Sequence, residues 1–432
     1  MLVTTESATN ITFNSAILNG VLDSQGRQPR LRVLFEWGTY PGGPYQGYVS
    51  TILGSAGSFS MKITDLEPER TYYFRSKINN VNPIYGVELS FTTMPDTIVK
   101  FSDVNLEKSI RNRLTILEGD IHQSNLMSVS ELNIQYVQLN NLAGLEYCTN
   151  LQTLQLSNNR IGDVSPLAGM KDLEFLYLNA NQIIDIAPLA GLQNLRRLEL
   201  GDNQIRDISW LADLKNLNKL SLLNNKIKDV SHLTKLDYLT SLNLSHNEIS
   251  DITALTNAKH LSHLDLSYNK ISDVSLLTNL PNLVLLELTN NKIRNVPSLS
   301  GTRMMRELYL GDNRLNDVSF LSELKQLRKI DLSNNRIKEL SPISNLGRLK
   351  VLNLDRNNIG DISVLAKLRK LQHLNLSNNK LHSLSPLVDN DKLGGSAKVY
   401  LLHSHADTTE DSEDMKNIRL LEDRGVVVRF ST

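Results

Sequence analysis

Few side chains in this sequence have the type and spacing that chemistry requires. The single cysteine is Cys148, and only two histidines, His403 and His405, stand close together. There is no Gly-rich phosphate loop, G-x-S-x-G turn, H-E-x-x-H pair or paired-cysteine spacing. Cys148 occupies a slot that leucine fills elsewhere, which favours a buried, inert thiol. The histidine pair has no third ligand nearby in sequence. We therefore predict no enzyme, no cofactor and no dedicated metal site.

Composition narrows the class of partner. The 432 residues contain 46 basic and 46 acidic side chains, so the net charge is zero. This argues against a nucleic-acid-binding protein and against a polybasic membrane anchor. No apolar run is long enough to span a bilayer, and one cysteine excludes a disulfide framework. The polar start MLVTTESATN shows no secretory signal.

A period of 22 residues organises the chain from Leu151 to residue 392. The pattern L-x-x-L-x-L-x-x-N-x-I-x-D-I-x-x-L-x-x-L fills eleven consecutive units without insertion, and a degenerate unit precedes them at 129–150. Positions 4 and 6 predict a short strand, and the apolar positions 11, 14, 17 and 20 predict an extended or 3₁₀ return. One unit cannot bury its apolar edge alone, so the units must stack as coils of a solenoid.

Two polar positions recur with the leucines. Position 9 is asparagine in all eleven regular units, and we expect this column to satisfy backbone groups at the bend after each strand. Position 13 is acidic except at Asn295 and Ser383. Capping of the turn that follows is the favoured role for these carboxylates, and a calcium ladder is the alternative.

The units, typified by LQTLQLSNNRIGDVSPLAGM, resemble the leucine-rich repeats of bacterial internalin-like proteins. The preceding segment IVKFSDVNLEKSIRNRL resembles the helical N-terminal cap of that family. It places Asp103 where it would cap a helix carrying Leu106, Ile110 and Leu114.

The segment after the repeats, SAKVYLLHSHADTTEDSEDMKNIRLLEDRGVVVRF, resembles a C-terminal cap of such arrays. It predicts a strand, then a helix with Met415, Ile418 and Leu421 turned inward, Gly425 at its end, and a final strand. Polar caps at both ends are what an open solenoid needs.

The leucine-poor first part predicts a separate all-β module, with strands near 11–22, 30–38, 49–53, 58–64, 71–79 and 87–93. Within LEPERTYYFRSKI, Leu66, Pro68 and Tyr72 resemble the tyrosine corner of fibronectin type III domains. That resemblance implies that Trp37 is the buried core tryptophan.

The expected fold is an all-β immunoglobulin-like sandwich followed by a curved leucine-rich-repeat solenoid. A parallel β-sheet would line the concave face, 3₁₀ or extended segments the convex side, and small α-helical caps the ends. The expected domain limits are 1–96 for the fibronectin type III-like sandwich, 97–128 for the N-terminal cap, 129–392 for twelve repeats and 393–432 for the C-terminal cap.

The surface of the strands is the candidate binding site. Positions 2, 3, 5, 7 and 8 are expected to point outward, and positions 3 and 5 vary from unit to unit, so the fold does not dictate them. Exposed aromatic and arginine side chains are frequent interface anchors. The alternative is that they are ordinary surface residues that suit strands by propensity. Two clusters of expected partner-binding residues follow: Phe175, Tyr177, Arg197 and Glu199 form one, and Tyr268, Leu285, Glu287 and Tyr309 form the other.

These observations and the resemblance imply a non-enzymatic, monomeric protein-recognition module of a bacterial surface or secreted protein, without nucleic-acid binding or membrane insertion. Because leader and anchor are missing, we expect a fragment of a longer chain. One alternative is a carbohydrate-binding accessory region, in which Tyr40, Tyr45, Tyr48 and Phe175 or Tyr177 would stack on sugar rings. Another is a cytosolic phosphatase-regulatory scaffold with a similar repeat, which the fibronectin-like module and the caps disfavour.

Overall fold

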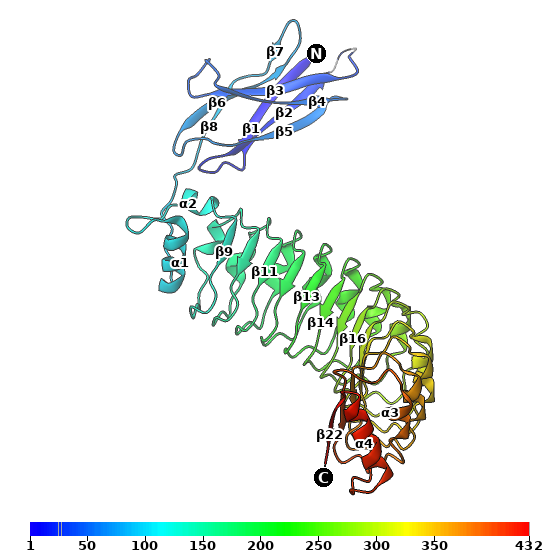
Figure 1. The fold of residues 1–432 in the computed structure, drawn as a ribbon. Helices are drawn as coiled ribbons and strands as arrows, with labels where there is room; N and C mark the ends of the chain where they lie inside the picture. The colour runs from blue at the N-terminus through cyan, green and yellow to red at the C-terminus, as the bar shows by residue number, and fades with distance from the viewer. Residues whose placement is uncertain (25, 27, 432) are drawn as a thin grey trace. The chain divides into compact units, whose positions relative to one another are not determined.

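The computed structural model describes every residue except 25, 27 and 432. The chain forms two compact units, coloured from blue to red along the chain in Figure 1. The first contains Met1–Val99 with Gly119–Asn125, and the second contains Lys100–Glu118 with Leu126–Thr432. Within the described residues, no helix has the length and apolar character needed to cross a membrane.

The first unit consists of two antiparallel sheets. One has the order β1 (Leu2–Thr9), β2 (Ala16–Ser24), β5 (Gly57–Ile63). The other has the order β4 (Gly47–Leu53), β3 (Leu31–Gly38), β6 (Thr71–Ile78), β7 (Ile84–Tyr85), and β8 (Leu89–Thr92) also pairs with β6. Burial alternates along β2 and β6, as expected for strands with one face on a core. The predicted sandwich is confirmed, and β1 is an additional strand that the sequence analysis did not include.

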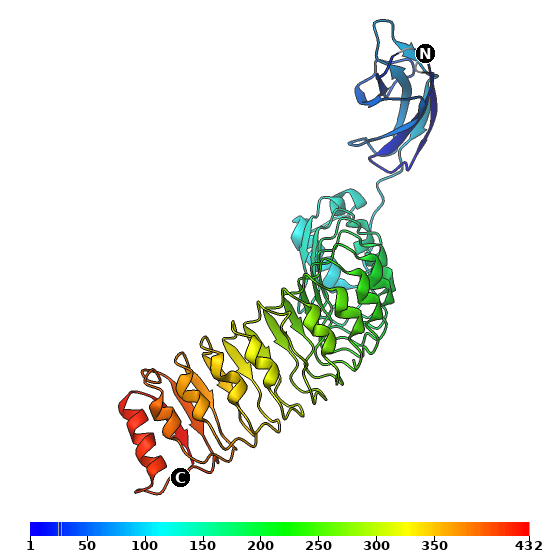
Figure 2. The ribbon, with the colours of Figure 1, turned by 90° about the vertical axis from the view of Figure 1, so that its right-hand side faces the viewer.

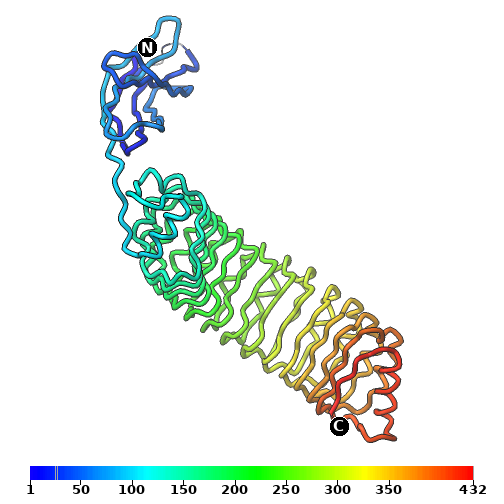
Figure 3. The backbone as a smooth tube through the Cα atoms, turned by 60° about the vertical axis from the view of Figure 1, so that its left-hand side comes forward, coloured from blue at the N-terminus to red at the C-terminus, as the bar shows by residue number. Residues whose placement is uncertain are grey.

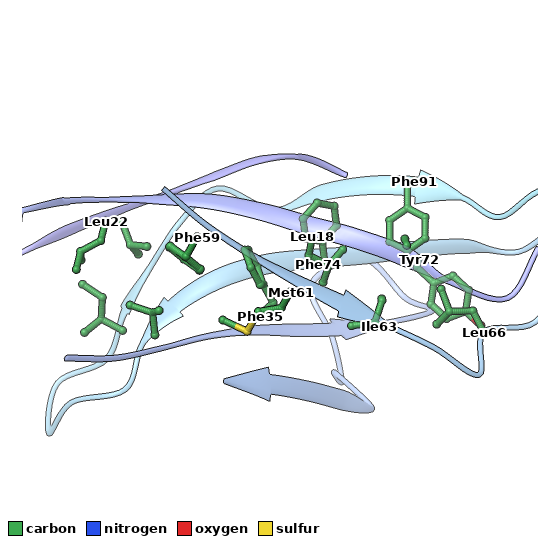
Figure 4. Close-up of a cluster of buried hydrophobic side chains, with 14 of the residues drawn as sticks. Leu18, Leu22, Phe35, Phe59, Met61, Ile63, Leu66, Tyr72, Phe74 and Phe91 are labelled. Carbon is green, nitrogen blue, oxygen red and sulfur yellow. The ribbon is translucent and has the colours of Figure 1, made fainter. Parts of the chain in front are cut away.

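Aromatic and aliphatic side chains together fill the core of this unit (Figure 4). Phe35 and Phe74 are fully buried, with ring centroids 6.2 Å apart. Tyr72 is buried, and its hydroxyl oxygen accepts a hydrogen bond of 2.8 Å from the backbone N–H of Glu67, which is the geometry of a tyrosine corner. Trp37 is only half-buried and packs at the margin of the core, so the expectation of a buried tryptophan is wrong. Phe35, two residues earlier on the same face of β3, takes the central place.

The second unit opens with α1 (Val104–Leu114), and α2 (Gln123–Met127) follows it in the chain. The Asp103 carboxylate accepts hydrogen bonds from the N–H groups of Asn105 and Leu106 at 2.9 and 3.2 Å, as predicted. The side chains of Leu106 and Ile110, on the inner face of this helix, are fully buried.

A parallel sheet of fourteen strands forms the body of this unit, in chain order from β9 to β22. Neighbouring strands within β9–β20 pair at an offset of 22 residues, so that Thr153 faces Phe175 and Phe175 faces Arg197. The predicted register is therefore confirmed. The strands are β9 (Glu131–Asn133), β10 (Thr153–Gln155), β11 (Phe175–Tyr177), β12 (Arg197–Glu199), β13 (Lys219–Ser221), β14 (Ser241–Asn243), β15 (His263–Asp265), β16 (Leu285–Glu287), β17 (Glu307–Tyr309), β18 (Lys329–Asp331), β19 (Val351–Asn353), β20 (His373–Asn375), β21 (Lys398–Leu401) and β22 (Val427–Phe430).

The return segments form a column of 3₁₀ turns on the side opposite the strands (Figure 2), and the stacked coils are seen as a tube in Figure 3. Helices α3 (Ser385–Asp389) and α4 (Glu413–Asp423) close the C-terminal end. The turns are η1 (Leu145–Tyr147), η2 (Ser165–Leu167), η3 (Ala187–Gly191), η4 (Ser209–Asp213), η5 (Ser231–Lys235), η6 (Thr253–Asn257), η7 (Ser275–Asn279), η8 (Ser319–Glu323), η9 (Ser341–Asn345) and η10 (Ser363–Lys367).

The asparagine column links each coil to the one before it. Asn203 Nδ2 donates to the carbonyl oxygens of Leu178, Leu200 and Gly201 at 3.0, 3.0 and 3.1 Å. Its Oδ1 accepts the N–H of Ile183 at 3.0 Å. Each amide therefore satisfies buried backbone groups of two coils, which confirms the predicted structural role.

The aspartate column caps the 3₁₀ turns. The Asp273 Oδ1 atom accepts the N–H of Ser275 at 2.8 Å, and the carboxylates of Asp207 and Asp361 do the same for Ser209 and Ser363. This hydrogen bond lowers the pKa of the three carboxyl groups. Capping is thus the role that the structure shows.

Candidate functional site

The concave strand face displays the variable positions as predicted. Position 4 of each repeat strand is buried, whereas positions 3 and 5 are half-exposed or exposed, except for the buried Ser221. Position 7 departs from the expectation in the coils where it is a buried serine or glycine: Ser267 is buried, and its hydroxyl donates to Asp265 at 2.6 Å. Leu223 and Asp355, at the same position of other coils, are half-exposed as expected. Position 8 adopts a left-handed backbone conformation in every regular coil. Side chains at position 8 therefore lie at the bend after the strand.

The first predicted cluster is brought together. Phe175 pairs with Arg197, and Tyr177 pairs with Glu199, across β11 and β12. The Arg197 guanidinium lies 5.3 Å from the centroid of the Tyr177 ring, and its Nε donates to Glu199 at 2.7 Å. The Glu199 hydrogen bond raises the pKa of Arg197. The ring contact and the hydrogen bond restrict the orientation of the Arg197 side chain.

A hollow of about 660 Å³ opens beside this cluster. Phe175 and Arg197 line it together with Lys219 and Tyr238, whereas Tyr177 and Glu199 are outside its lining. Tyr238 is 62% exposed and stacks on His260 of the next coil, with ring centroids 6.5 Å apart. Sequence reasoning missed Tyr238. The signal was an aromatic at position 22, three residues before the strand begins, aligned with His260 one period later.

The second predicted cluster is only partly assembled. Glu287 pairs with Tyr309 and Leu285 pairs with Glu307 across β16 and β17. The Tyr309 hydroxyl donates to Glu307 at 2.8 Å. Tyr268 lies instead at the bend after β15, where its ring stacks on His246 with centroids 4.0 Å apart.

Carboxylates gather around Glu287 on the middle strands. Asp265 is its neighbour on β15, and Asp331 lies beyond Tyr309 on β18. Burial, and then the negative charges of Asp265, Asp331 and Glu307, raise the pKa of Glu287 to about 7. The centre of the concave face is therefore acidic, and it contrasts with Arg197 and Lys219 nearer the N-terminal end.

The first unit carries a second polar surface on the outer side of β6. The Arg75 guanidinium lies between two rings, 4.7 Å from the centroid of Tyr45 and 4.0 Å from that of Tyr85. Glu36 pairs with Arg75 and Lys77 at 2.5 and 3.2 Å. Burial and the hydrogen bond to Glu88 raise the pKa of Tyr45 to about 12.

Of the three tyrosines predicted as a sugar-stacking set, Tyr45 is thus held within this network. Tyr40 and Tyr48 are 60% and 75% exposed.

The cysteine and the histidine pair were the candidates for reactive or metal-binding chemistry. Cys148 is fully buried, and burial followed by the charge of Glu146 raises the pKa of its thiol to about 12. His403 and His405 are exposed and both have positive φ angles. Across the described residues, no group of three or more histidine, cysteine or acidic side chains has an arrangement that could hold a metal ion.

Comparison with known proteins gives the family of the repeats. The model of paired leucine-rich repeats matches residues 149–191, 193–235, 239–277, 259–301 and 303–345, and a second leucine-rich-repeat model matches 325–381. A search of curated proteins found no match.

Three solved structures illustrate the likeness. An internalin (inlF) from Listeria monocytogenes is 29% identical, with a TM-score of 0.64 over 77% of this chain and 91% of that one. A leucine-rich-repeat protein from Leptospira interrogans shares the fold at 22% identity, with a TM-score of 0.61 over 74% of this chain and 87% of that one. TLR13, solved in complex with ssRNA13, is 25% identical, with a TM-score of 0.54 over 71% of this chain and 51% of that one. The 22-residue register, the asparagine column and the family matches together show that the chain belongs to the leucine-rich-repeat family, with a likeness to the Listeria internalin.

Proposed function

We propose that the chain recognises a protein ligand through the concave strand face, with Phe175, Tyr177, Arg197 and Glu199 as its main anchor. The observation that carries this proposal is the preorganised Tyr177–Arg197–Glu199 stack beside an open hollow. Arginine and aromatic side chains fixed before binding lose little conformational entropy when a partner docks. The leucine-rich-repeat fold is itself typical of protein recognition over extended concave surfaces.

The charge of the face supports a protein partner rather than a nucleic acid. One relative in the comparison was solved with single-stranded RNA. In the present chain, Asp265, Glu287 and Asp331 follow one another along the concave centre, with only Tyr309 between them. A phosphate backbone laid along these strands would be repelled, because nucleic-acid affinity depends on the neutralisation of phosphates by basic groups.

The proposal also covers the cellular location of the protein and the role of the first unit. Its likeness to a Listeria internalin supports a bacterial surface or secreted protein, with the first unit as a fibronectin type III-like spacer. The tyrosine corner at Tyr72 supports that assignment of the first unit. The domain limits proposed for the chain remain 1–96, 97–128, 129–392 and 393–432. A glycan ligand for Tyr40 and Tyr48 is the second candidate, supported by the exposure of these two rings.

An array of secreted proteins and receptor ectodomains tests the protein-binding proposal. Wild type is compared with Tyr177→Ala/Arg197→Ala, and with Ile184→Ala/Arg206→Ala as a matched control on the exposed flank of the same two coils. A ligand of the concave face should lose affinity by about tenfold or more only with the first variant. Ligands that respond equally to both variants, or an array without ligands, would contradict the proposal. Binding to a glycan array that requires Tyr40 and Tyr48 would favour the second candidate.

A further inference from the structure

One coil of the solenoid, residues 283–304, departs from the rule that its neighbours follow. Position 15 is Pro297, which has no N–H for a position-13 carboxylate to cap, and position 13 is the uncharged Asn295. Every residue between β16 and β17 is described, and none of them forms a 3₁₀ turn. Val296 is half-exposed, although the equivalent side chains of the other regular coils are at most 3% exposed.

A notch lies beside the start of η7, where the coil 283–304 has no 3₁₀ turn. Its volume is about 570 Å³, and Asp273, Ser272 and Ser275 of the preceding coil form one wall. The remaining lining comes from the irregular coil and the coil after it: Lys292, Arg294, Asn295, Val296, Pro297 and Arg314. Apolar surface of Val296 and Pro297 is therefore placed beside three cationic side chains.

Several described basic side chains around the notch have no acidic partner. Lys270, Lys292, Arg314 and Arg336 stand at position 10 of four consecutive coils, and all four are exposed. Lys270 is paired with Glu248 at 2.8 Å. Among the residues that the structure describes, Lys292, Arg294 and Arg314 take part in no ion pair within 4.0 Å. Asp273 is the one acidic residue in the lining, and its Oδ1 atom is already engaged by the N–H of Ser275.

We propose that this notch binds an acidic peptide segment of a partner protein, whose carboxylates pair with Lys292, Arg294 and Arg314 while an apolar side chain packs on Val296 and Pro297. Arginine forms bidentate pairs with carboxylates, and a row of cations on successive coils suits an extended chain. The apolar floor favours a peptide over a sulfated polysaccharide or a nucleic acid, because neither of these has an aliphatic side chain to bury there. The notch lies beyond the concave strands, so this proposal stands or fails independently of the proposed function.

A random-sequence peptide display library, selected on the full chain, tests the proposal without knowledge of the natural partner. Enriched peptides are expected to combine Asp or Glu with an apolar residue. By fluorescence anisotropy, their affinity should fall about tenfold or more with Lys292→Glu/Arg294→Glu. The matched control is Lys226→Glu/Lys228→Glu, which reverses the charges at positions 10 and 12 of a coil with an intact turn, and should leave affinity within about twofold.

A second variant restores the regular turn and keeps the three basic side chains of the notch. Asn295→Asp/Pro297→Ser restores the capping pair of the other coils, so the chain should keep or gain thermal stability while the peptides lose affinity. Heparin and oligo-deoxythymidine are titrated in parallel. The proposal is overturned if no acidic peptide is enriched, or if the enriched peptides bind all variants equally. Binding of heparin or oligo-deoxythymidine that requires Lys292 and Arg294, without any peptide binding, would also overturn it.

Discussion

Glu287 faces Tyr309 across the β16–β17 pair, and Asp265 occupies the equivalent place on the other side of Glu287. Tyr309 donates its hydroxyl to Glu307, so it does not neutralise Glu287. The pKa of Glu287 is accordingly raised from 4.5 to about 7 by burial and by the neighbouring carboxylates. Between these two values the folded chain binds more protons than the unfolded chain, and the free energy of unfolding must fall as the pH rises through this window.

Glu287→Gln should remove this loss of stability at higher pH. We expect the variant to be more stable than wild type at pH 8, by about 1 kcal/mol after allowance for solvent screening, and nearly equal to it at pH 5. Denaturant unfolding at the two pH values measures the difference. Glu422→Gln, at an exposed site on α4, should show no such pH dependence. An equal effect of Glu287→Gln at both pH values would contradict the electrostatic explanation.

Asn203→Ala should destabilise the solenoid strongly. The substitution removes the acceptor of the buried Ile183 N–H, at a cost of about 1–3 kcal/mol. The carbonyl oxygens of Leu178 and Leu200 each lose one of two amide donors, because Asn181 and Asn225 also donate to them. Asn316→Ala changes the same residue type at an exposed position and should stay within about 0.5 kcal/mol of wild type. Chemical denaturation followed by circular dichroism distinguishes the two variants. Similar midpoints would refute the structural role of the asparagine column.

The capping column offers a matched pair in consecutive coils. Asp273→Ala should cost about 1 kcal/mol, because the N–H of Ser275 loses its acceptor. Asn295→Ala should cost much less, because Pro297 presents no N–H to accept. Hydrogen exchange at Ser275 provides a local readout, and it should accelerate in the first variant only.

The period of 22 residues was sufficient to predict the strand register and the roles of the two polar columns, because stacking repeats one local solution in every coil. Local pattern could not predict Arg75 between Tyr45 and Tyr85, since β6 and β7 and the loop before β4 come together only in the tertiary fold. Tyr268 was assigned to the strand surface because position 8 directly follows the strand positions.

The left-handed conformation at position 8 turns Tyr268 toward His246 instead. The notch had a signal in the sequence, since Pro297 stands where the other coils need an N–H. Its significance depends on the capping bond at position 15, which only the structure shows.

Gly301 and Gly169 occupy position 19 of their coils, and they should respond in opposite ways to alanine. A Cβ atom at Gly301 would overlap the backbone carbonyl oxygen of Thr278 in the preceding coil. The irregular coil can relieve this overlap only by moving its backbone, and we expect Gly301→Ala to cost about 2–3 kcal/mol. A Cβ atom at Gly169 meets nothing within 4 Å, so Gly169→Ala should be neutral or stabilise by up to about 1 kcal/mol.

Thermal unfolding measures both glycine variants. If Gly301→Ala proved as stable as Gly169→Ala, the close approach of the irregular coil to Thr278 would be refuted. Peptides selected on the notch add a second readout, because a shift of the backbone near Gly301 should also move Pro297 and weaken their binding. Loss of peptide affinity in Gly301→Ala with retained affinity in Gly169→Ala would show that the closure of this coil shapes the notch.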